Sequence, residues 1–344
     1  MNHPRTIVAL PGEGIGIEVV EATLTILRHL ANLHNLKLEI EYGAIGQSAF
    51  EEYGEYFPPV TAEKCDRANG ILFGAVTKGG LLELRKRFDF FVNLRPVKTI
   101  PSLLNKSSLK PEYLTNVDIL FVRELVSGIY FGRSARTIDE RGKYGYHTMQ
   151  YYDWQIERIA EVALAKAQQR RGLLTVAHKE NALPNLPWTN LVQQVAKKYP
   201  SVTIEPMLVD NLAMQLVINP QHFDVVLAGN LFGDILSDLG GALVGSIGLL
   251  GSASLNSQGL GLYEPVHGTA PDIAGKNQAN PLGTLNSATM MLEQWGELGA
   301  VASIQQAYSR ILAQGYRTRD LYSQPGETLV TTQELVDLFL KELS

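Results

Sequence analysis

Three things are scarce in this sequence, and each scarcity excludes a class of protein. Cys65 is the only cysteine among 344 residues, which excludes internal disulfides and cysteine-based metal sites. No apolar run reaches the roughly 18 residues that a membrane-spanning helix needs. Neither sign of charge dominates, because 30 Lys and Arg stand against 35 Asp and Glu. A net charge of -5 argues against a nucleic acid or an anionic membrane as the main partner.

What remains is an ordinary globular composition. The chain is 45% hydrophobic and 19% charged, and it is long enough for one large domain or two medium ones. Its first residues, 1–5, lead into an apolar strand without the basic and apolar segments of a secretion signal. We therefore expect a cytoplasmic protein.

Short apolar runs alternate with segments of helical periodicity, which is typical of an α/β fold. The expected strands are residues 6–10, 36–42, 70–73, 117–122, 173–177, 202–205 and 223–229. The expected helices are residues 15–30, 154–171, 188–199, 284–295 and 333–343.

The segment 125–150 departs from this alternation. It is rich in Gly, Arg and Tyr and contains a turn-prone sequence at 139–142, so an extended arm or hairpin that reaches a second subunit is expected there. The chain shows no repeat and no clear linker. A second domain must therefore be inserted into the first.

Two aspartates follow an apolar strand at a spacing of one helical turn. The strand is residues 223–229, Asn230 is a suitable N-cap, and Asp234 and Asp238 lie on the helix that follows. Open α/β sheets place ligands at the carboxyl ends of their strands, and two carboxylates on one helix face suit Mg2+ or Mn2+. A solvated helix face is the alternative interpretation.

Two further segments bear on a nucleotide cofactor. Residues 11–16 follow a strand, but their glycines are spaced G-x-G-x-G, so an ordinary Rossmann site is not expected there. The Gly-, Pro- and Asn-rich segment 263–281 is a shaped loop, in which His267 and backbone N–H groups could hold phosphates and a base. Asp272 would accept hydrogen bonds from a ribose and repel a 2'-phosphate, which favours NAD over NADP. A structural loop is the alternative.

Several longer motifs occur along the chain in the same order as in one known family. They are residues 11–16, 93–96, 123–132, 233–238 and 264–281. In these motifs the chain resembles the β-decarboxylating hydroxyacid dehydrogenases, the isocitrate/isopropylmalate dehydrogenase family, from about residue 5 to the C-terminus.

The resemblance implies a two-domain α/β fold without a standard Rossmann domain. The cofactor-side domain would combine residues 1–92 and 246–344, and residues 93–245 would form the substrate, metal and dimerisation domain. The arm at about 125–150 would lie at the interface of a homodimer whose active sites are shared between subunits.

The resemblance also implies which residues bind the substrate. Arg85, Arg95 and Arg123 match the family's binders of substrate carboxylates, a task that suits the two-pronged guanidinium group. Read alone, each would be a surface salt-bridge partner.

Asp234 and Asp238 match two of the family's ligands for Mg2+ or Mn2+. Asp210 of the partner subunit matches the third and also contacts the substrate. The resemblance further implies NAD as the cofactor and K+ as an additional cation.

An acid–base pair is implied as well. Lys179, contributed by the partner subunit, would help to deprotonate the substrate's 2-hydroxyl, which requires a lowered lysine pKa. Tyr130 would protonate the carbon that loses CO2; without the motif it would be read as a packing aromatic.

Further residues match the family's NAD site. Asn181 would lie near the nicotinamide, and Lys78 stands where the family usually carries a Glu beside it. The remaining matches are His267, Gly268, Ala270, Asp272, Ile273 and Asn280.

Leu81 and Leu82 match the positions that face the alkyl group of an isopropylmalate, although core packing is an alternative for both. The expected reaction is NAD-dependent oxidative decarboxylation of (2R,3S)-3-isopropylmalate to 4-methyl-2-oxopentanoate, a step of leucine biosynthesis. Lys78, the Val126-Ser127 pair, the motif at 178–181 and Gly251 depart from the pattern. They leave open another 3-alkyl- or 3-arylmalate, homoisocitrate or D-malate. Outside the enzyme class, a silent regulatory subunit of a dehydrogenase complex is the alternative.

Overall fold

The structure, a computed structural model, describes residues 4–323 and 325–344. The expectation of a chain without a signal segment rests in part on residues 1–3, which lie outside the described residues. Strands and helices alternate along the chain, which confirms the predicted α/β class. The chain forms two compact units: unit 1 is Met1–Asp89, Ile100–Ser108 and Val244–Ser344, and unit 2 is Phe90–Thr99 and Leu109–Leu243.

Unit 1 contains both ends of the chain. Its strands are β1 (Arg5–Gly12), β2 (Leu38–Tyr42), β3 (Gly70–Ala75), β11 (Gly251–Leu255), β12 (Gly261–Pro265), β13 (Tyr316–Arg317) and β14 (Thr328–Leu329). Its helices are α1 (Ile15–His34), α2 (Gln47–Tyr53), α3 (Pro59–Arg67), α4 (Leu81–Arg87), η1 (Pro101–Lys106), η4 (Ile247–Leu249), α10 (Leu282–Gln294), α11 (Leu298–Ala313) and α12 (Thr332–Leu343).

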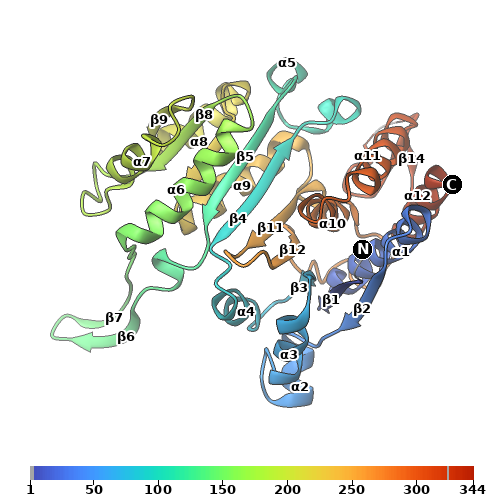
Figure 1. Cartoon of the computed structure of the whole chain (residues 1–344), viewed down its shortest axis with the longest axis horizontal. Helices are drawn as coiled ribbons and strands as arrows, with labels where there is room; N and C mark the ends of the chain where they lie inside the picture. Colours follow the sequence, from blue (N-terminus) through green and yellow to red (C-terminus); the bar gives the residue numbers. More distant parts are fainter. Residues whose placement is uncertain (1–3, 324) are drawn as a thin grey trace. The chain divides into compact units, whose positions relative to one another are not determined.

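The core of unit 1 forms around β1 and β3. Residues 7–10 of β1 and all of β3 are buried, as expected for strands covered on both faces. The main strands run in the order β2-β1-β3-β12-β11. The pairs β2–β1, β1–β3 and β3–β12 are parallel, and the pair β12–β11 is antiparallel. Helix α1 packs on β1 and β3, and the C-terminal helix α12 lies beside α1 (Figure 1).

Unit 2 is built from the middle of the chain. Its strands are β4 (Val92–Lys98), β5 (Asp118–Glu124), β6 (Ser134–Asp139), β7 (Gly142–His147), β8 (Leu173–His178), β9 (Thr203–Leu208) and β10 (Val225–Ala228). Its helices are α5 (Pro111–Leu114), η2 (Gly128–Tyr130), α6 (Asp153–Gln168), α7 (Trp188–Ala196), α8 (Val209–Ile218), η3 (Pro220–His222) and α9 (Asn230–Val244).

The main strands of unit 2 run in the order β4-β5-β10-β8-β9. Strands β5, β10, β8 and β9 pair in parallel, whereas β4 is antiparallel to β5. Helix α6 packs against β5, β8 and β10. The parallel strands all end at one edge of the sheet. Arg123 near the end of β5, Lys179 directly after β8, and the start of α9 after β10 therefore all lie at that edge.

The segment predicted as an arm contains an antiparallel hairpin. Strands β6 and β7 pair from Ser134 opposite His147 to Asp139 opposite Gly142, and their side chains are mostly exposed. Figure 1 shows that this hairpin projects away from the other strands and helices of unit 2.

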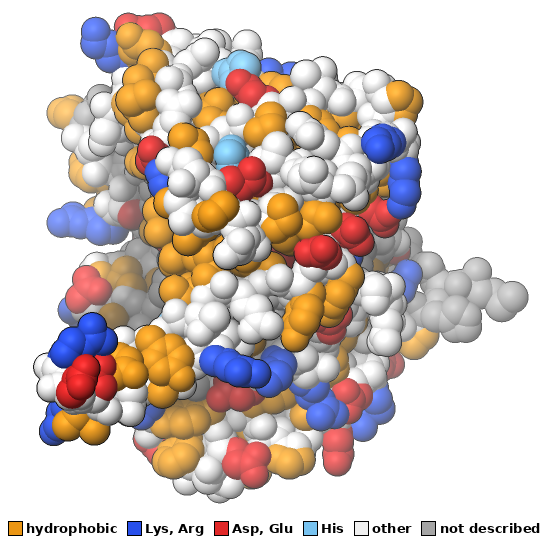
Figure 2. Space-filling view, turned by 90° about the vertical axis from the view of Figure 1, so that its left-hand side faces the viewer, with side chains coloured by type: hydrophobic (Ala, Val, Ile, Leu, Met, Phe, Trp, Pro, Cys, Tyr) orange, Lys and Arg blue, Asp and Glu red, His pale blue; other side chains and the backbone are white. Residues whose placement is uncertain are grey.

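The surface gives little sign of a single dominant charge. On the face drawn in Figure 2, basic and acidic side chains are mixed with hydrophobic ones. Within residues 4–323 and 325–344, no helix is both long enough and apolar enough to cross a membrane.

Candidate active site

Unit 2 brings two of the predicted arginines together with two of the predicted aspartates. Arg123 Nη1 lies 2.5 Å from Asp234 Oδ1. Arg95 Nη1 lies 2.9 Å from Asp238 Oδ1, and its Nη2 lies 3.4 Å from Asp234 Oδ1. Both aspartates thus contact Arg95, as one helical turn of spacing predicts.

Tyr130 completes this group. Its hydroxyl donates a hydrogen bond to Asp234 Oδ2 at 3.0 Å, and the Arg123 guanidinium lies 5.9 Å from the centre of its ring. Burial raises the pKa of Tyr130, and the negative charge of Asp234 raises it further. We call Arg95, Arg123, Tyr130, Asp234 and Asp238 the arginine–aspartate cluster.

In the arginine–aspartate cluster the cations lie deep and the anions face outward. The Arg95 and Arg123 side chains are 9% and 2% exposed, whereas those of Asp234 and Asp238 are 32% and 49% exposed. Burial raises the pKa of Asp238, with Arg95 opposing the rise and Asp234 adding to it. The cluster therefore offers accessible carboxylate oxygens above a buried positive charge.

Asn230 does not act as the predicted N-cap. Helix α9 begins at Asn230 itself, and its side-chain oxygen accepts from Arg123 rather than from the helix's own amides. The side-chain amide donates to the carbonyls of Leu125 and Ser127. The side chain is fully buried among these partners, which is why it serves tertiary contacts instead of the helix end.

Lys179 and Asp210 form a second polar group of unit 2. Lys179 follows β8, Asp210 lies in the first turn of α8, and Lys179 Nζ is 2.5 Å from Asp210 Oδ1. The hydrogen bond from Lys179 lowers the pKa of Asp210. We call these two residues the Lys179–Asp210 pair.

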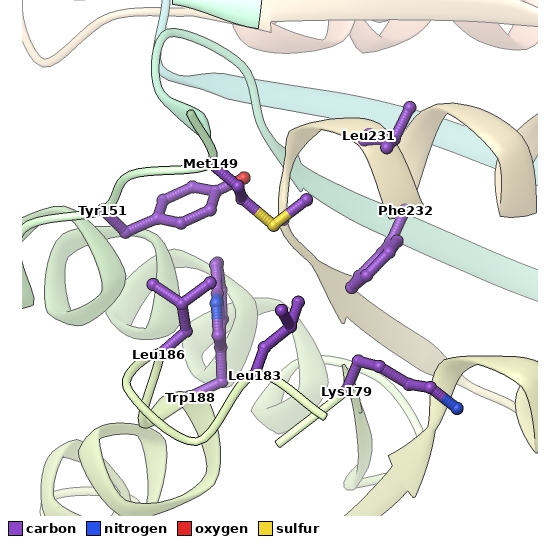
Figure 3. A pocket seen from close by; sticks show the side chains of 9 residues that line it. Met149, Tyr151, Lys179, Leu183, Leu186, Trp188, Leu231 and Phe232 are labelled. Carbon is purple, nitrogen blue, oxygen red and sulfur yellow. The ribbon is translucent and has the colours of Figure 1, made fainter. Parts of the chain in front are cut away.

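A small, mainly apolar pocket adjoins Lys179. Its lining includes Met149, Tyr151, Leu183, Trp188, Leu231 and Phe232. In Figure 3 the lysine amino group points away from these side chains, so the stem of Lys179 borders the pocket and its charge lies outside it.

The donor set of the two groups suits a hard divalent cation. Asp234 and Asp238 present carboxylate oxygens on one helix face, and Mg2+ commonly binds through one or two carboxylates and retains several waters. Among the described residues no three His, Cys, Asp or Glu side chains converge as a metal site, so Asp210 does not join Asp234 and Asp238 within one chain.

The third predicted arginine belongs to unit 1. Arg85, in α4, is 8% exposed, and its Nη2 pairs with Glu264 Oε1 at 2.6 Å. Its buried Nε has no hydrogen-bond partner among the described residues. The chain turns into α4 through Gly79 and Gly80, both at positive φ, which brings Leu81 and Leu82 to the helix start. Leu82 is 46% exposed, Leu81 is half-buried, and Lys78 is exposed with its amino group 5.9 Å from the ring centre of Tyr56.

The predicted NAD loop of unit 1 packs against the start of α1. Ala270 and Ile273 lie on the cluster formed by Ile15, Val19 and Ala279. Ala270 adopts φ 38°, and the N–H of Ile15 donates to the Thr269 carbonyl at 2.9 Å. A Cβ at Gly14 would lie 2.1 Å from that carbonyl oxygen, so glycine is required for the close approach of segment 11–16 to the loop.

Two side chains of this loop bear on ligand binding. Within the part of the chain that the structure describes, the buried Nε2 of His267 has no hydrogen-bond partner. Burial lowers the pKa of the imidazole, which favours a neutral ring. Asn280 is 6% exposed, and its amide group donates to Asp320 and accepts from the Leu282 N–H. A buried ring nitrogen that could take up a further hydrogen bond fits a site for a ligand with hydrogen-bonding groups, such as a nucleotide base.

The remaining predicted cofactor residues are more open. Gly268 and Asp272 are exposed in the same loop, and no atom of the described residues lies within 4 Å of a Cβ placed on Gly268. Asn181 belongs to unit 2, where it is exposed in the turn that follows Lys179.

Sequence reasoning missed the structural roles of three residues that hold predicted site residues or the turn beside them. Glu264 pairs with Arg85, Asn230 holds Arg123, and the buried Glu124 accepts hydrogen bonds from the Val126 and Ser127 amides. Glu264 is 179 positions from Arg85, so no local pattern could reveal their pairing. Glu124 directly follows Arg123, and an acid at the end of an apolar strand is the only local signal it gives.

The chain is similar to known proteins over nearly its whole length. The family model described as isocitrate/isopropylmalate dehydrogenase matches residues 6–339. The chain is 44% identical to the 3-isopropylmalate dehydrogenase of Carboxydothermus hydrogenoformans, over 99% of this chain and 95% of that protein. It is 46% identical to the 3-isopropylmalate dehydrogenase of Nitrosomonas europaea, over 98% of this chain and 99% of that protein.

Two crystal structures share the fold. The isocitrate dehydrogenase of Methylococcus capsulatus superposes with a TM-score of 0.89 at 28% identity, over 98% of this chain and 99% of that one. The β-decarboxylating dehydrogenase of Thermococcus kodakarensis, in its apo form, superposes with a TM-score of 0.80 at 31% identity, over 98% and 96%.

Proposed function

The chain belongs to the isocitrate/isopropylmalate dehydrogenase family and is a decarboxylating dehydrogenase, and from that premise we propose its reaction. We propose that it oxidises and decarboxylates (2R,3S)-3-isopropylmalate to 4-methyl-2-oxopentanoate with NAD and a divalent cation, in leucine biosynthesis. The observation that carries the proposal is the arginine–aspartate cluster, in which two buried guanidinium groups lie beneath two accessible carboxylates and a tyrosine hydroxyl.

The guanidinium groups account for recognition of a dianionic substrate. Arg95 and Arg123 are buried, so their charge is poorly screened by water and attracts carboxylates more strongly than a surface arginine would. Arg85 would bind a substrate carboxylate through the donors that Glu264 does not occupy. Its buried, unpartnered Nε supports that role, because such a group gains from an added acceptor.

Asp234 and Asp238 would hold the divalent cation together with Asp210 of the partner subunit. The cation, when bound, supplies positive charge beside the substrate oxygens that become negative as CO2 leaves. The side chains of Asp234 and Asp238 are exposed enough to reach a cation, since 32% and 49% of their areas face solvent.

The loop of His267 and Asn280 would hold NAD, which accepts the substrate's hydride when bound. A neutral His267 and the held amide of Asn280 suit hydrogen bonding to an adenine. The accessible carboxylate of Asp272 suits a ribose diol and disfavours a 2'-phosphate.

Two protein groups would move protons. Lys179 would accept the proton of the substrate's 2-hydroxyl, and the adjoining Asp210 would balance the resulting ammonium charge. Tyr130 would deliver a proton to carbon 3 after CO2 leaves. Its raised pKa keeps the phenol protonated near neutral pH, and its hydrogen bond to Asp234 orients it.

One observation favours a second candidate substrate. Lys78 places a cation three residues before the half-buried Leu81, close to the side chains proposed to face the 3-substituent. A lysine there would favour a substituent that carries a negative charge, as homoisocitrate does. The apolar Leu81 and Leu82 favour an alkyl group instead, and we give them more weight because both match positions that face the alkyl group, whereas Lys78 matches a position beside the nicotinamide.

The direct test is NADH formation by the purified protein with Mn2+ and K+. Substrates would include 3-isopropylmalate, D-malate, isocitrate, homoisocitrate and benzylmalate, each compared by kcat/KM for the wild type and for Lys78→Glu. We expect 3-isopropylmalate to give the highest value with the wild type and the variant to leave that ranking unchanged. If another malate ranks first, or if Lys78→Glu moves the preference towards 3-isopropylmalate, the proposed substrate is wrong.

A further inference from the structure

Asn230 forms hydrogen bonds with three parts of unit 2, and the proposed chemistry depends on the relative positions of these parts. We propose that it is a positioning residue: it fixes Arg123, and the turn that carries Tyr130, against the helix that carries Asp234. The kinetic part of this inference rests on the proposed function, whereas its structural part does not.

The first link is to Arg123. Asn230 Oδ1 accepts hydrogen bonds from Arg123 Nε at 3.2 Å and from Nη2 at 2.7 Å. With that edge of the guanidinium held, Nη1 reaches Asp234 Oδ1 at 2.5 Å. Asn230 and Asp234 lie one turn apart on α9, so Arg123 is fixed along a single helix face.

The second link is to the turn between β5 and η2. Asn230 Nδ2 donates to the carbonyls of Leu125 at 3.0 Å and Ser127 at 2.9 Å. Glu124 holds the amides of the same turn, because its carboxylate accepts from the N–H groups of Val126 and Ser127. Buried side chains thus hold both the donors and the acceptors of the turn that leads into Tyr130.

The third link is to Tyr151, which follows the hairpin. The backbone N–H of Asn230 donates to the Tyr151 hydroxyl at 2.8 Å. Glycines make the necessary room: a Cβ at Gly128 would lie 2.2 Å from that hydroxyl oxygen, and one at Gly229 would lie 2.8 Å from it. A Cβ at Gly233 would lie 2.7 Å from Arg123 Cγ.

Only asparagine meets all of these requirements. Its amide has two N–H donors and an oxygen that can accept two hydrogen bonds, and all of this capacity is used here. Alanine would leave two turn carbonyls without this donor. Aspartate would turn an oxygen towards those carbonyls and add a negative charge that competes with Asp234 for Arg123.

A double-mutant cycle between Asn230→Ala and Tyr130→Phe tests the kinetic role, with the best malate of the substrate panel. Asn230→Ala should lower kcat roughly ten- to hundredfold, as a misplaced reacting group does. If Asn230 acts through Tyr130, the double variant should be no slower than the slower single variant, because the function of Tyr130 can be lost only once. Fully multiplicative effects would overturn the proposal.

Asn256→Ala is the matched control. Asn256 lies in unit 1, where its side chain donates to the Phe88 carbonyl and accepts from the N–H groups of Gln258 and Leu260. Its loss removes a comparable set of hydrogen bonds outside the proposed machinery. The control should retain kcat within about twofold and should combine multiplicatively with Tyr130→Phe.

Hydrogen exchange tests the structural role without any substrate. In Asn230→Ala the amides of residues 125–131 should exchange faster than in the wild type, while those of β1 and β3 in unit 1 should be unchanged. Unchanged protection of residues 125–131 would refute the positioning role, and a loss of protection throughout both units would show general unfolding instead, which also contradicts it. If the wild type oxidises none of the malates, the proposed function fails and the exchange result still decides this inference.

Discussion

Arg123 shows at the scale of single residues how the fold sustains a buried charge. A guanidinium that is 2% exposed is costly unless it is paired and hydrogen-bonded, and Asn230 and Asp234 together provide this. The contact from Asp234 Oδ1 to Nη1 balances the charge, but one contact to one nitrogen does not fix the plane of the guanidinium. The neutral amide of Asn230 fixes that plane by accepting from Nε and Nη2, and Asp234 keeps part of its carboxylate exposed to solvent.

Glu124 is the residue that links the site to pH. It is fully buried, and burial raises its pKa from 4.5 to about 7, although hydrogen bonds from Ser127 and Val126 and the charge of Arg158 oppose the rise. A carboxyl group whose pKa is higher in the folded state binds its proton more tightly there. Its contribution to stability is therefore greatest below pH 4.5 and falls as the pH rises through about 7.

We therefore expect Glu124→Gln to flatten this part of the pH dependence. The free energy of unfolding of the wild type should fall relative to that of the variant between about pH 5 and pH 8, because glutamine resembles the protonated acid and does not titrate. Urea unfolding at several pH values measures this. A constant difference between the two proteins across that range would mean that Glu124 keeps one protonation state throughout.

Sequence alone identifies the residues of the site better than their partners. The spacing of Asp234 and Asp238 predicts that they face one way, and both do contact Arg95. The pairing of Arg85 with Glu264 depends on how distant segments meet, so no spacing rule reveals it. The position of Asn230 after a strand predicts a cap, but burial against Arg123 outweighs that local preference.

At the scale of elements, periodicity predicts the helices with a long apolar stripe. The expected helix at 15–30 is α1, and the one at 333–343 is α12, each extending only slightly beyond the prediction. Strand β4 is not predicted, because Asn93, Arg95 and Pro96 interrupt its apolar pattern. Asn93 and Arg95 are buried although they are polar, and Arg95 belongs to the arginine–aspartate cluster. Helix α11 is not predicted, although its buried residues, from Ala300 to Leu312, keep a helical spacing.

The turn before Tyr130 depends on the backbone of Gly128. This residue has φ +74°, and a Cβ there would meet the Tyr151 hydroxyl. Gly54 has a similar φ of +76°, and no atom of residues 4–323 and 325–344 lies within 4 Å of a Cβ placed there. Gly128→Ala should therefore destabilise the protein by about 1 kcal/mol or more beyond the cost of Gly54→Ala, which carries the backbone penalty alone.

Thermal and urea unfolding of both variants measure that difference. Gly128→Ala should also lower kcat, because Tyr130 follows two residues later, and Gly54→Ala should not. Equal destabilisation by the two substitutions would show that the contact with Tyr151 does not constrain the turn.

At the scale of the whole molecule, the two polar groups of unit 2 suggest how an active site is assembled. The Lys179–Asp210 pair keeps together the two residues expected from a partner subunit, and the arginine–aspartate cluster keeps together those expected from the chain itself. Sequence resemblance predicts this division between two subunits. We propose that the β6–β7 hairpin, with Ile138, Tyr144 and Tyr146 exposed, helps to form the homodimer in which the two groups meet.

Mixed dimers of two inactive variants, Lys179→Ala and Asp234→Asn, test most directly whether two subunits share each active site. They are assayed for NADH formation from 3-isopropylmalate. One chain of each mixed dimer keeps Asp234 and the other keeps Lys179, so one of its two sites is intact if sites are shared. Random association makes half of the dimers mixed, and activity should return to about a quarter of the wild-type value. Activity that stays at the level of the separate variants, while the mixed dimers are shown to form, would contradict a shared site.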